Sequence, residues 1–243
     1  MLKRILIIWV IANFAIVGLV SWMAGGWYIG WHVSPVIGML AELGLIMVPN
    51  LILPIVVLRY WWPEPVGSIR DSFGWRWNGW RSLVAGVLAF VPFYVLVKVI
   101  VWLVGGSIPY NLPRATGEGI AINEPSDILK ALGMLLGLLA FVMITVVGEE
   151  TMFRGWIQTQ VGKRYGVWVG LLVGVVLFGL RHLPADLFYA QIWQATPQMW
   201  LSRQLQLYLV AICLGLARHF GKSTYASAIM HVLVFVVALF GLW

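Results

Sequence analysis

Residues 146–156 read VVGEETMFRGW and contain two adjacent acids, Glu149 and Glu150, at the end of a long apolar run. Glu150 and Arg154 are spaced i, i+4, so on a helix their side chains share one face and can pair. Glu149 then lies about 100° around the helix from Glu150 and can face a cavity. A carboxylate shielded from bulk water suits general-base catalysis. The alternative is structural, with both acids balancing Arg154 near the inner membrane interface.

Two of the four histidines, His182 and His231, stand inside apolar runs that read LFGLRHLP and SAIMHVLVF. Phe178 precedes His182 by about one helical turn, so an aromatic ring flanks this imidazole. A single histidine in a membrane helix commonly forms a hydrogen bond to a neighbouring helix. Two such histidines together with a double acid favour a site that activates water.

The turn GKRYG, residues 162–166, makes the two apolar runs that flank it a helical hairpin. Glu149 lies fourteen residues before the midpoint of this turn and His182 lies eighteen residues after it, a mismatch of about 6 Å. His231 follows Lys222 by nine residues, about 13 Å along a helix. With the turn projecting about 10 Å into the cytosol, the three residues fall within one helical turn of each other in depth, and the spacing allows one shared site within the membrane.

Membrane helices must position these residues, because the composition is that of a membrane protein. The chain has 243 residues, of which 61% are hydrophobic and 10% charged, and its mean hydropathy is +0.91. Soluble domains carry about 25% charged residues. We therefore predict an all-α fold, a polytopic transmembrane helical bundle that forms a single integral membrane domain over residues 1–243. About seven spans are expected, over residues 5–23, 36–58, 82–105, 128–161, 166–182, 205–219 and 223–243.

The distribution of Lys and Arg predicts the orientation of this bundle and argues against nucleic-acid binding. With the N-terminus in the cytosol, eleven of the sixteen basic residues lie on the inner side: Lys3, Arg4, Arg59, Arg70, Arg76, Arg81, Arg154, Lys163, Arg164, Arg218 and Lys222. Arg114, Lys130, Arg181 and Arg203 fall on the outer side or at outer span ends. Tryptophans such as Trp75 lie near run ends, as interfacial residues do. We predict an N-in, C-out multi-pass protein, of the plasma (inner) membrane if the source is bacterial.

Glu42 and Lys98 are two further ionisable residues inside predicted spans. Both lie about 10 Å below the same outer surface, which predicts an ion pair between neighbouring helices. Together with Asn50 they also raise the hypothesis of a small transporter. The two-fold repeat that is typical of transporters is not visible in the sequence.

The ordered motifs E-E-x-x-x-R (149–154), F-x-x-x-H (178–182) and a late His231 resemble the CPBP, or ABI, family of intramembrane proteases, which are related to type II CAAX prenyl endopeptidases. The resemblance covers residues 128–243, which carry the protease-like motif core. It implies an intramembrane endopeptidase with a cavity open toward the cytosol. By the same resemblance, Glu149 and His182 activate a water, Glu150 and Arg154 brace the site, and His231 stabilises the oxyanion.

One position departs from the family pattern, which usually reads H-x-x-x-N where this chain has HVLVF. Phe235 stands in place of the asparagine that would donate to the oxyanion. Ser227, one turn before His231, and Asn50 are candidate substitutes for this donor. The alternative is a catalytically weak or inactive membrane-binding or immunity-type factor with the same fold.

A metal is a further alternative. Glu149, His182 and His231 can form a two-histidine, one-carboxylate zinc site with an open position for water. The H-E-x-x-H spacing that places two ligands on one helical face is missing. We favour a glutamate mechanism without a required cofactor. The resemblance implies a membrane-associated protein or lipidated peptide as substrate, such as a prenylated CAAX protein, an anchored sorting signal or a bacteriocin-related precursor.

Overall fold

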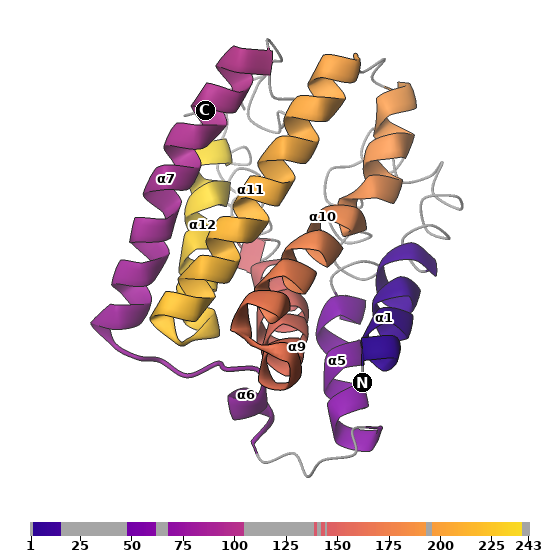
Figure 1. Cartoon of the computed structure of the whole chain (residues 1–243), viewed down its shortest axis with the longest axis vertical. Coiled ribbons are helices and arrows are strands. Elements are labelled where there is room, and N and C mark those ends of the chain that lie inside the picture. The colour runs from indigo at the N-terminus through magenta and orange to yellow at the C-terminus, as the bar shows by residue number, and fades with distance from the viewer. Residues whose placement is uncertain are drawn as a thin grey trace, which may run out of the picture.

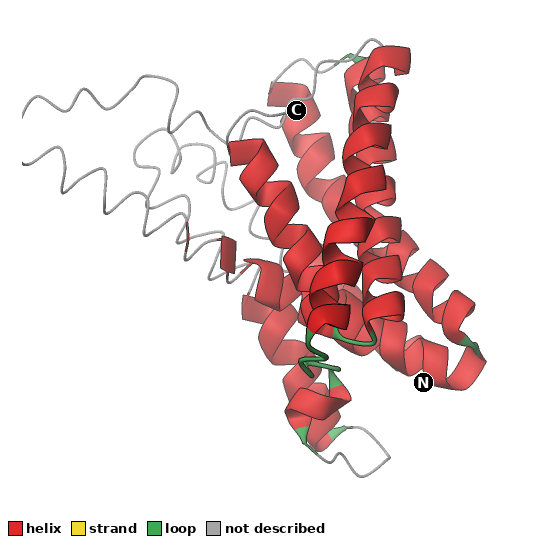
Figure 2. Ribbon diagram, turned by 90° about the vertical axis from the view of Figure 1, so that its left-hand side faces the viewer, coloured by secondary structure: helices red, strands yellow, loops and turns green. Residues whose placement is uncertain are grey.

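The computed structural model describes residues 2–15, 48–61, 68–104, 139, 142–143, 145–192 and 196–239. All regular structure in these ranges is helical, which confirms the predicted all-α class there (Figure 2). The elements are α1 (Leu2–Val10), η1 (Ile11–Ala15), α5 (Val48–Tyr60), α6 (Ile69–Ser72), α7 (Trp80–Val104), η3 (Glu150–Gln158), α9 (Thr159–Tyr165), α10 (Val167–Ile192), α11 (Pro197–Gly221) and α12 (Thr224–Leu239).

The helices surround η3, whose nine residues are all buried. α7, α11 and α12 pack against one another, and α10 packs against α11 (Figure 1). α5, α10, α11 and α12 all contact η3, so segments that are far apart in sequence meet around one buried turn of chain. This arrangement places the double acid at the centre of the bundle.

Two helices, α7 and α11, are long and apolar enough to cross a membrane. Shorter apolar helices cover residues 49–60, 167–183 and 224–237. The predicted spans 5–23, 36–58 and 128–161 lie partly outside the described ranges, as do Glu42 and residues 105–138. The count of seven spans and the N-in orientation therefore stay predictions.

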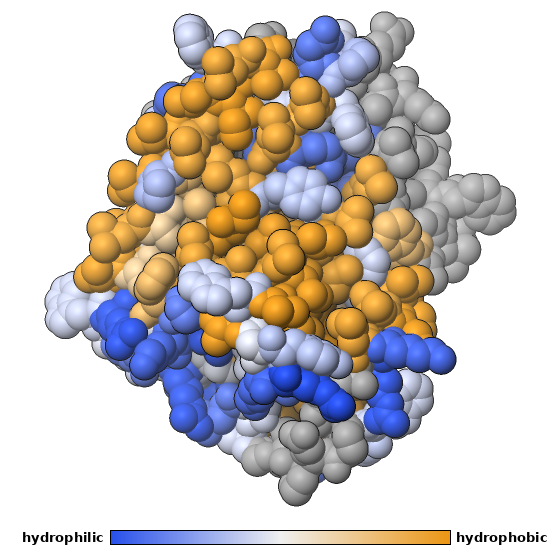
Figure 3. Space-filling model, viewed as in Figure 1, coloured by the Kyte–Doolittle hydropathy of each residue, from blue (hydrophilic) through white to orange (hydrophobic). Residues whose placement is uncertain are grey.

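The hairpin predicted around residues 162–166 is confirmed. α9 ends at Tyr165, and Gly166 takes a φ of 98°, which glycine adopts without a steric penalty, before α10 begins at Val167. Exposed basic side chains gather at this end of the bundle, where hydrophilic atoms line the lower edge of Figure 3. They include Lys3, Arg4, Arg81, Lys163, Arg164 and Lys222.

Two helices extend beyond the predicted spans. α10 continues ten residues past 182, and α11 begins eight residues before 205. A buried ion pair explains both extensions, because Asp186 accepts from Arg203 Nε at 2.5 Å and from Gln204 Nε2 at 2.8 Å. The polar residues that mark the predicted ends are thus satisfied inside the bundle.

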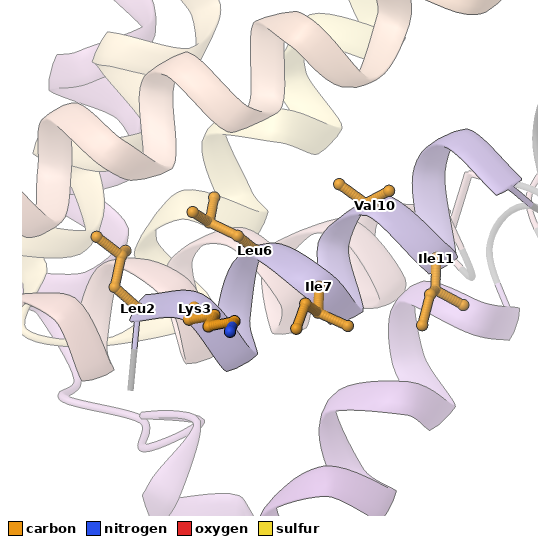
Figure 4. A pocket seen from close by; sticks show the side chains of 6 residues that line it. All are labelled: Leu2, Lys3, Leu6, Ile7, Val10 and Ile11. Atoms are coloured by element: carbon orange, nitrogen blue, oxygen red, sulfur yellow. The ribbon is translucent and has the colours of Figure 1, made fainter.

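The outward surfaces of the outer helices are apolar. On α1, a hollow is lined by Leu2, Lys3, Leu6, Ile7, Val10 and Ile11 (Figure 4). On α7, Val84, Leu88, Val91, Val95 and Trp102 are exposed. Large exposed aliphatic side chains are costly in water and suit contact with lipid.

Gly86 on α7 gives a test of the packing against α12. A Cβ atom at this position would lie 2.6 Å from the carbonyl oxygen of Ala226 and 2.9 Å from Cγ2 of Ile229. We expect Gly86→Ala to lower the free energy of unfolding by about 1–3 kcal/mol because the two helices must separate. Thermal unfolding in detergent measures this loss.

Gly162→Ala is the matched control, because a Cβ there meets only the Cα of Val167 at an ordinary 3.7 Å. Alanine also favours a helix over glycine by about 1 kcal/mol. Equal melting temperatures for the two variants would contradict the close approach of α7 and α12.

Candidate active site

The two acids lie where an α-helix gives way to a π-helix. Residues 145–149 are α-helical and η3 begins at Glu150. Glu149 is 4% exposed and Glu150 is 0% exposed. The span predicted over 128–161 therefore contains a π-helical segment, Glu150–Gln158, followed by α-helix from Thr159. π-helices are rare, and they occur frequently at functional sites.

Glu150 is bound from two sides. Its Oε1 lies 3.4 Å from Nη1 of Arg154, which confirms the predicted i, i+4 pair, and 2.8 Å from Nδ1 of His231. Arg154 also donates from Nη2 to the carbonyl oxygen of Ala211 on α11, at 3.3 Å. Because a carboxylate only accepts, Nδ1 of His231 is the donor in this contact. Glu150 thus joins η3 to α12 and fixes the imidazole of His231.

The free edge of the His231 ring faces the other acid. Nε2 of His231 lies 3.8 Å from Oε2 of Glu149. On α10, His182 has its Nδ1 3.0 Å from the carbonyl oxygen of Phe178, which can only accept. Nδ1 of His182 is therefore the donor, and its Nε2 carries the lone pair when the ring is neutral. Both histidines have their Nδ1 committed to an acceptor.

The ring of Phe178 lies between the parts of the site. Its centroid is 5.0 Å from that of His182 and 6.4 Å from that of His231. The Arg154 guanidinium lies over the same ring, with Cζ 4.3 Å from its centroid. The predicted convergence of the three motifs is confirmed by these contacts, since Phe178 touches a residue of each.

Arg181 is the residue that the sequence prediction missed. Its Nη1 forms an ion pair with Oε1 of Glu149, and both side chains are at least 94% buried. The sequence placed Arg181 on the outer side or at an outer span end, whereas α10 runs on to Ile192 and Arg181 lies near the middle of this helix. The signal was present in the sequence: a basic residue directly before His182 inside an apolar run.

The remaining predicted residues lie around this centre. Ser227 is buried, donates to the carbonyl oxygen of Thr224 at 3.0 Å and lies beside the Glu150 carboxyl group. Asn50 is buried in α5, which packs against η3. Phe235 stacks on His231 with 5.3 Å between centroids and an interplanar angle of 16°. Phe235 therefore covers one face of the imidazole.

A segment before α7 packs under the acids, which the sequence did not indicate. Trp75 is half-buried, and its Nε1 donates to Oγ1 of Thr151, the residue after Glu150, at 3.0 Å. Thr224 at the start of α12 donates from its backbone nitrogen to the carbonyl oxygen of Gly74 at 2.9 Å. The interfacial role predicted for Trp75 is therefore incomplete, because its indole also supports η3.

Lys98 lies apart from these residues. It is exposed on α7, and its ammonium group lies 4.9 Å from the centroid of the Tyr94 ring. Its predicted partner Glu42 falls outside the described residues.

The side chains of the site are poorly arranged to bind a metal ion. Within the ranges that the structure describes, no three His, Cys, Asp or Glu side chains are grouped so as to hold a metal ion. The alternative ligand Glu149 is paired with Arg181, and Nδ1 of His231 is bound to Glu150. The arrangement does not fit the zinc site considered from the sequence.

The segment that holds this site is similar to a known protein family. Residues 131–237 match the model of the type II CAAX prenyl endopeptidase Rce1-like family. This part of the chain is similar to that family. The matched residues include both acids, both histidines and Arg181. This similarity and the two apolar helices α7 and α11 both support a location in a membrane. The comparisons with curated proteins and with solved structures gave no match.

The Glu150–Arg154 pair allows a direct test. Arg154→Met leaves the Glu150 carboxylate buried without this cation, and we expect a loss of about 3–5 kcal/mol in stability. The double variant Glu150→Gln, Arg154→Met removes both charges and should lose less. Thermal unfolding in detergent compares them.

Arg164→Met provides the control, because Arg164 is exposed at the hairpin end. It should melt like wild type. A double variant less stable than Arg154→Met alone would contradict the pairing.

Proposed function

We propose that this chain is an intramembrane endopeptidase of the CAAX type that cleaves a membrane-associated protein or a lipidated peptide. The observation that carries the proposal is the grouping of the buried Glu149, Glu150 and His231 with the half-buried His182 around Phe178. It lies inside the segment that is similar to a prenyl endopeptidase family. This similarity supports proteolysis in general, and the geometry supports these residues as its centre.

In the proposed reaction, a water bound by Glu149 and by Nε2 of His182 attacks the carbonyl carbon of the scissile peptide. Glu149 takes a proton from the water as the new C–O bond forms. The same proton then passes to the leaving nitrogen as the C–N bond breaks. The water is consumed, one new carboxyl group and one new amine are produced, and Glu149 returns to its starting form.

His231 serves the oxyanion in this scheme. Since Nδ1 already donates to Glu150 at 2.8 Å, donation from Nε2 requires the doubly protonated ring. Two carboxylates flank that ring, with Oε1 of Glu150 2.8 Å from Nδ1 and Oε2 of Glu149 3.8 Å from Nε2. Such a preorganised donor is worth about 10²–10³ in kcat.

We further propose that the reaction requires no metal, because the groups that activate water and bind the oxyanion are already present in these side chains. Arg154 and Arg181 supply the positive charges that a metal would otherwise bring. Activity that survives dialysis against a chelator supports this proposal, and activity restored only by a divalent cation would overturn it.

The wider setting is also proposed. A multi-pass protein with its basic end in the cytosol would meet substrates at the inner face of the membrane, the plasma (inner) membrane if the source is bacterial. Prenylated CAAX proteins, anchored sorting signals and bacteriocin-related precursors all present a cleavable segment there. We prefer this function to a transporter because the buried charges are paired around one site.

A second candidate is a non-catalytic membrane-binding or immunity-type factor. The observation that favours it is Phe235, which stacks on His231 where the family usually has asparagine. In that case the fold and its ion pairs would serve binding alone, with Ser227 and Asn50 as structural residues.

Peptide termini separate the two candidates. In membrane fractions of cells that carry wild type, we expect new protein termini that are absent with Glu149→Gln, because the variant lacks the general base. Mass spectrometry of these termini identifies both the reaction and the substrate.

Asp71→Asn is the control, because Asp71 is an exposed acid that pairs with Arg76 away from the site. It should yield the wild-type termini. Identical termini for wild type and Glu149→Gln at equal protein levels would favour the non-catalytic factor.

Phe235 gives a separate test on the cleaved peptide. We expect Phe235→Asn to raise kcat, because the amide adds an oxyanion donor beside His231. Phe235→Leu, which removes the stacked ring and adds no donor, should not raise it. Kinetics with purified protein in lipid nanodiscs measures both, and a gain in the leucine variant alone would contradict this role.

A further inference from the structure

The site contains two ion pairs, Glu150–Arg154 and Glu149–Arg181. The motif E-E-x-x-x-R provides two carboxylates and a single guanidinium, and Glu150 takes that guanidinium. A second carboxylate buried without a countercharge would cost several kcal/mol. Arg181, from another helix, forms an ion pair with Glu149 and supplies the missing charge.

The pair divides the two oxygens of Glu149 between different tasks. Oε1 lies against Nη1 of Arg181, and Oε2 faces Nε2 of His231 at 3.8 Å. A guanidinium is planar and its N–H groups are directional, so this contact orients Oε1 of the carboxylate as well as balancing its charge. Oε2 is thereby directed toward the side of the site where the histidines lie.

Arg181 and His182 are adjacent on α10, so one helix carries both the partner of Glu149 and the second water-binding group. His182 is itself held by the contact of Nδ1 with the Phe178 carbonyl oxygen at 3.0 Å. A shift of α10 would therefore move both groups relative to Glu149 at the same time. The geometry couples the position of the base to the position of the histidine.

We propose that Arg181 is a positioning residue for the reaction: its guanidinium holds Oε1 of Glu149 so that Oε2 takes the proton of the attacking water. This inference rests on the proposed endopeptidase function. When Glu149 accepts the proton, the ion pair loses its charge attraction. Delivery of that proton to the leaving nitrogen restores the pair, so Arg181 favours the second half of the cycle.

A purely structural ion pair is the alternative, and the two roles predict different kinetics. A structural role lowers the amount of folded enzyme and leaves the folded enzyme's kcat and pH profile unchanged. A positioning role lowers kcat with little change in KM, because Arg181 is buried against Glu149 and acts through that carboxylate. It also moves the acid limb of the pH–rate profile to higher pH, since without the guanidinium the carboxylate is protonated more readily.

The experiment uses full-length protein in nanodiscs and a fluorogenic peptide that spans the cleavage site found from the termini. Arg181→Gln is expected to lower kcat by about 10²-fold, the size of effect that a misplaced catalytic group produces. Arg181→Lys keeps the charge and loses the planar guanidinium, so it should keep the wild-type pH profile and recover only part of kcat. Arg76→Gln, which removes an exposed ion pair with Asp71 away from the site, is the control and should keep the wild-type kcat and pH profile.

A spectroscopic readout needs no substrate. Infrared titration should show the band of a protonated carboxyl group at neutral pH in Arg181→Gln. The same band should be missing in wild type and in the double variant Glu149→Gln, Arg181→Gln. Its assignment to Glu149 follows from that difference.

The outcomes distinguish this inference from the function on which it rests. If folded Arg181→Gln keeps the wild-type kcat and acid limb while Glu149→Gln is inactive, Arg181 is only structural and the inference is overturned. If Glu149→Gln cleaves the peptide as fast as wild type, the proposed function itself fails.

Discussion

The structure depends on one electrostatic constraint: two carboxylates sit side by side in an apolar bundle, away from water. Each needs a cation within contact distance, because an unpaired buried charge is far more costly than the hydrophobic burial of one side chain can offset. Arg154 meets this need from the same helix and Arg181 from α10. The requirement explains why η3 lies at the centre and why α10 passes directly beside it.

Aromatic rings and glycines pack around the charged residues of the site. Phe178 is 2% exposed and presents its faces to an imidazole and a guanidinium, so the polar groups are separated from lipid by a ring rather than by water. Glycines allow the supporting elements to approach. A Cβ at Gly155 of η3 would lie 2.8 Å from the carbonyl oxygen of Phe73, and one at Gly179 would lie 2.4 Å from the Tyr208 ring. The site therefore relies on close packing from several directions.

Local patterns in the sequence predicted much of this arrangement. Helical spacing alone gave the Glu150–Arg154 pair, and the basic turn at 162–166 fixed the hairpin that brings Glu149 and His182 to similar depths. What could not be predicted depends on tertiary contacts. Arg181 was assigned from its distance to the end of an apolar run, but Asp186 and Arg203 neutralise each other and allow α10 to continue.

The π-helical form of η3 was equally inaccessible, since hydrophobic periodicity does not distinguish an i→i+5 from an i→i+4 pattern over nine residues. The hydrogen bond from Trp75 to Thr151 joins residues that are 76 positions apart in the sequence. A local sequence pattern does not predict such a contact. The family resemblance suggested which residues take part in catalysis. The structure shows which side chains contact them, such as Arg181 against Glu149.

The π-helix has a consequence for comparing this chain with its relatives. A single residue added to or deleted from the stretch between Arg154 and the hairpin turn rotates everything before it by about 100° relative to α9 and α10. Every letter of the three motifs would survive such an indel, yet the acids would no longer face the histidines. In an alignment, the number of residues between the double acid and the hairpin is therefore as informative as the motif letters themselves.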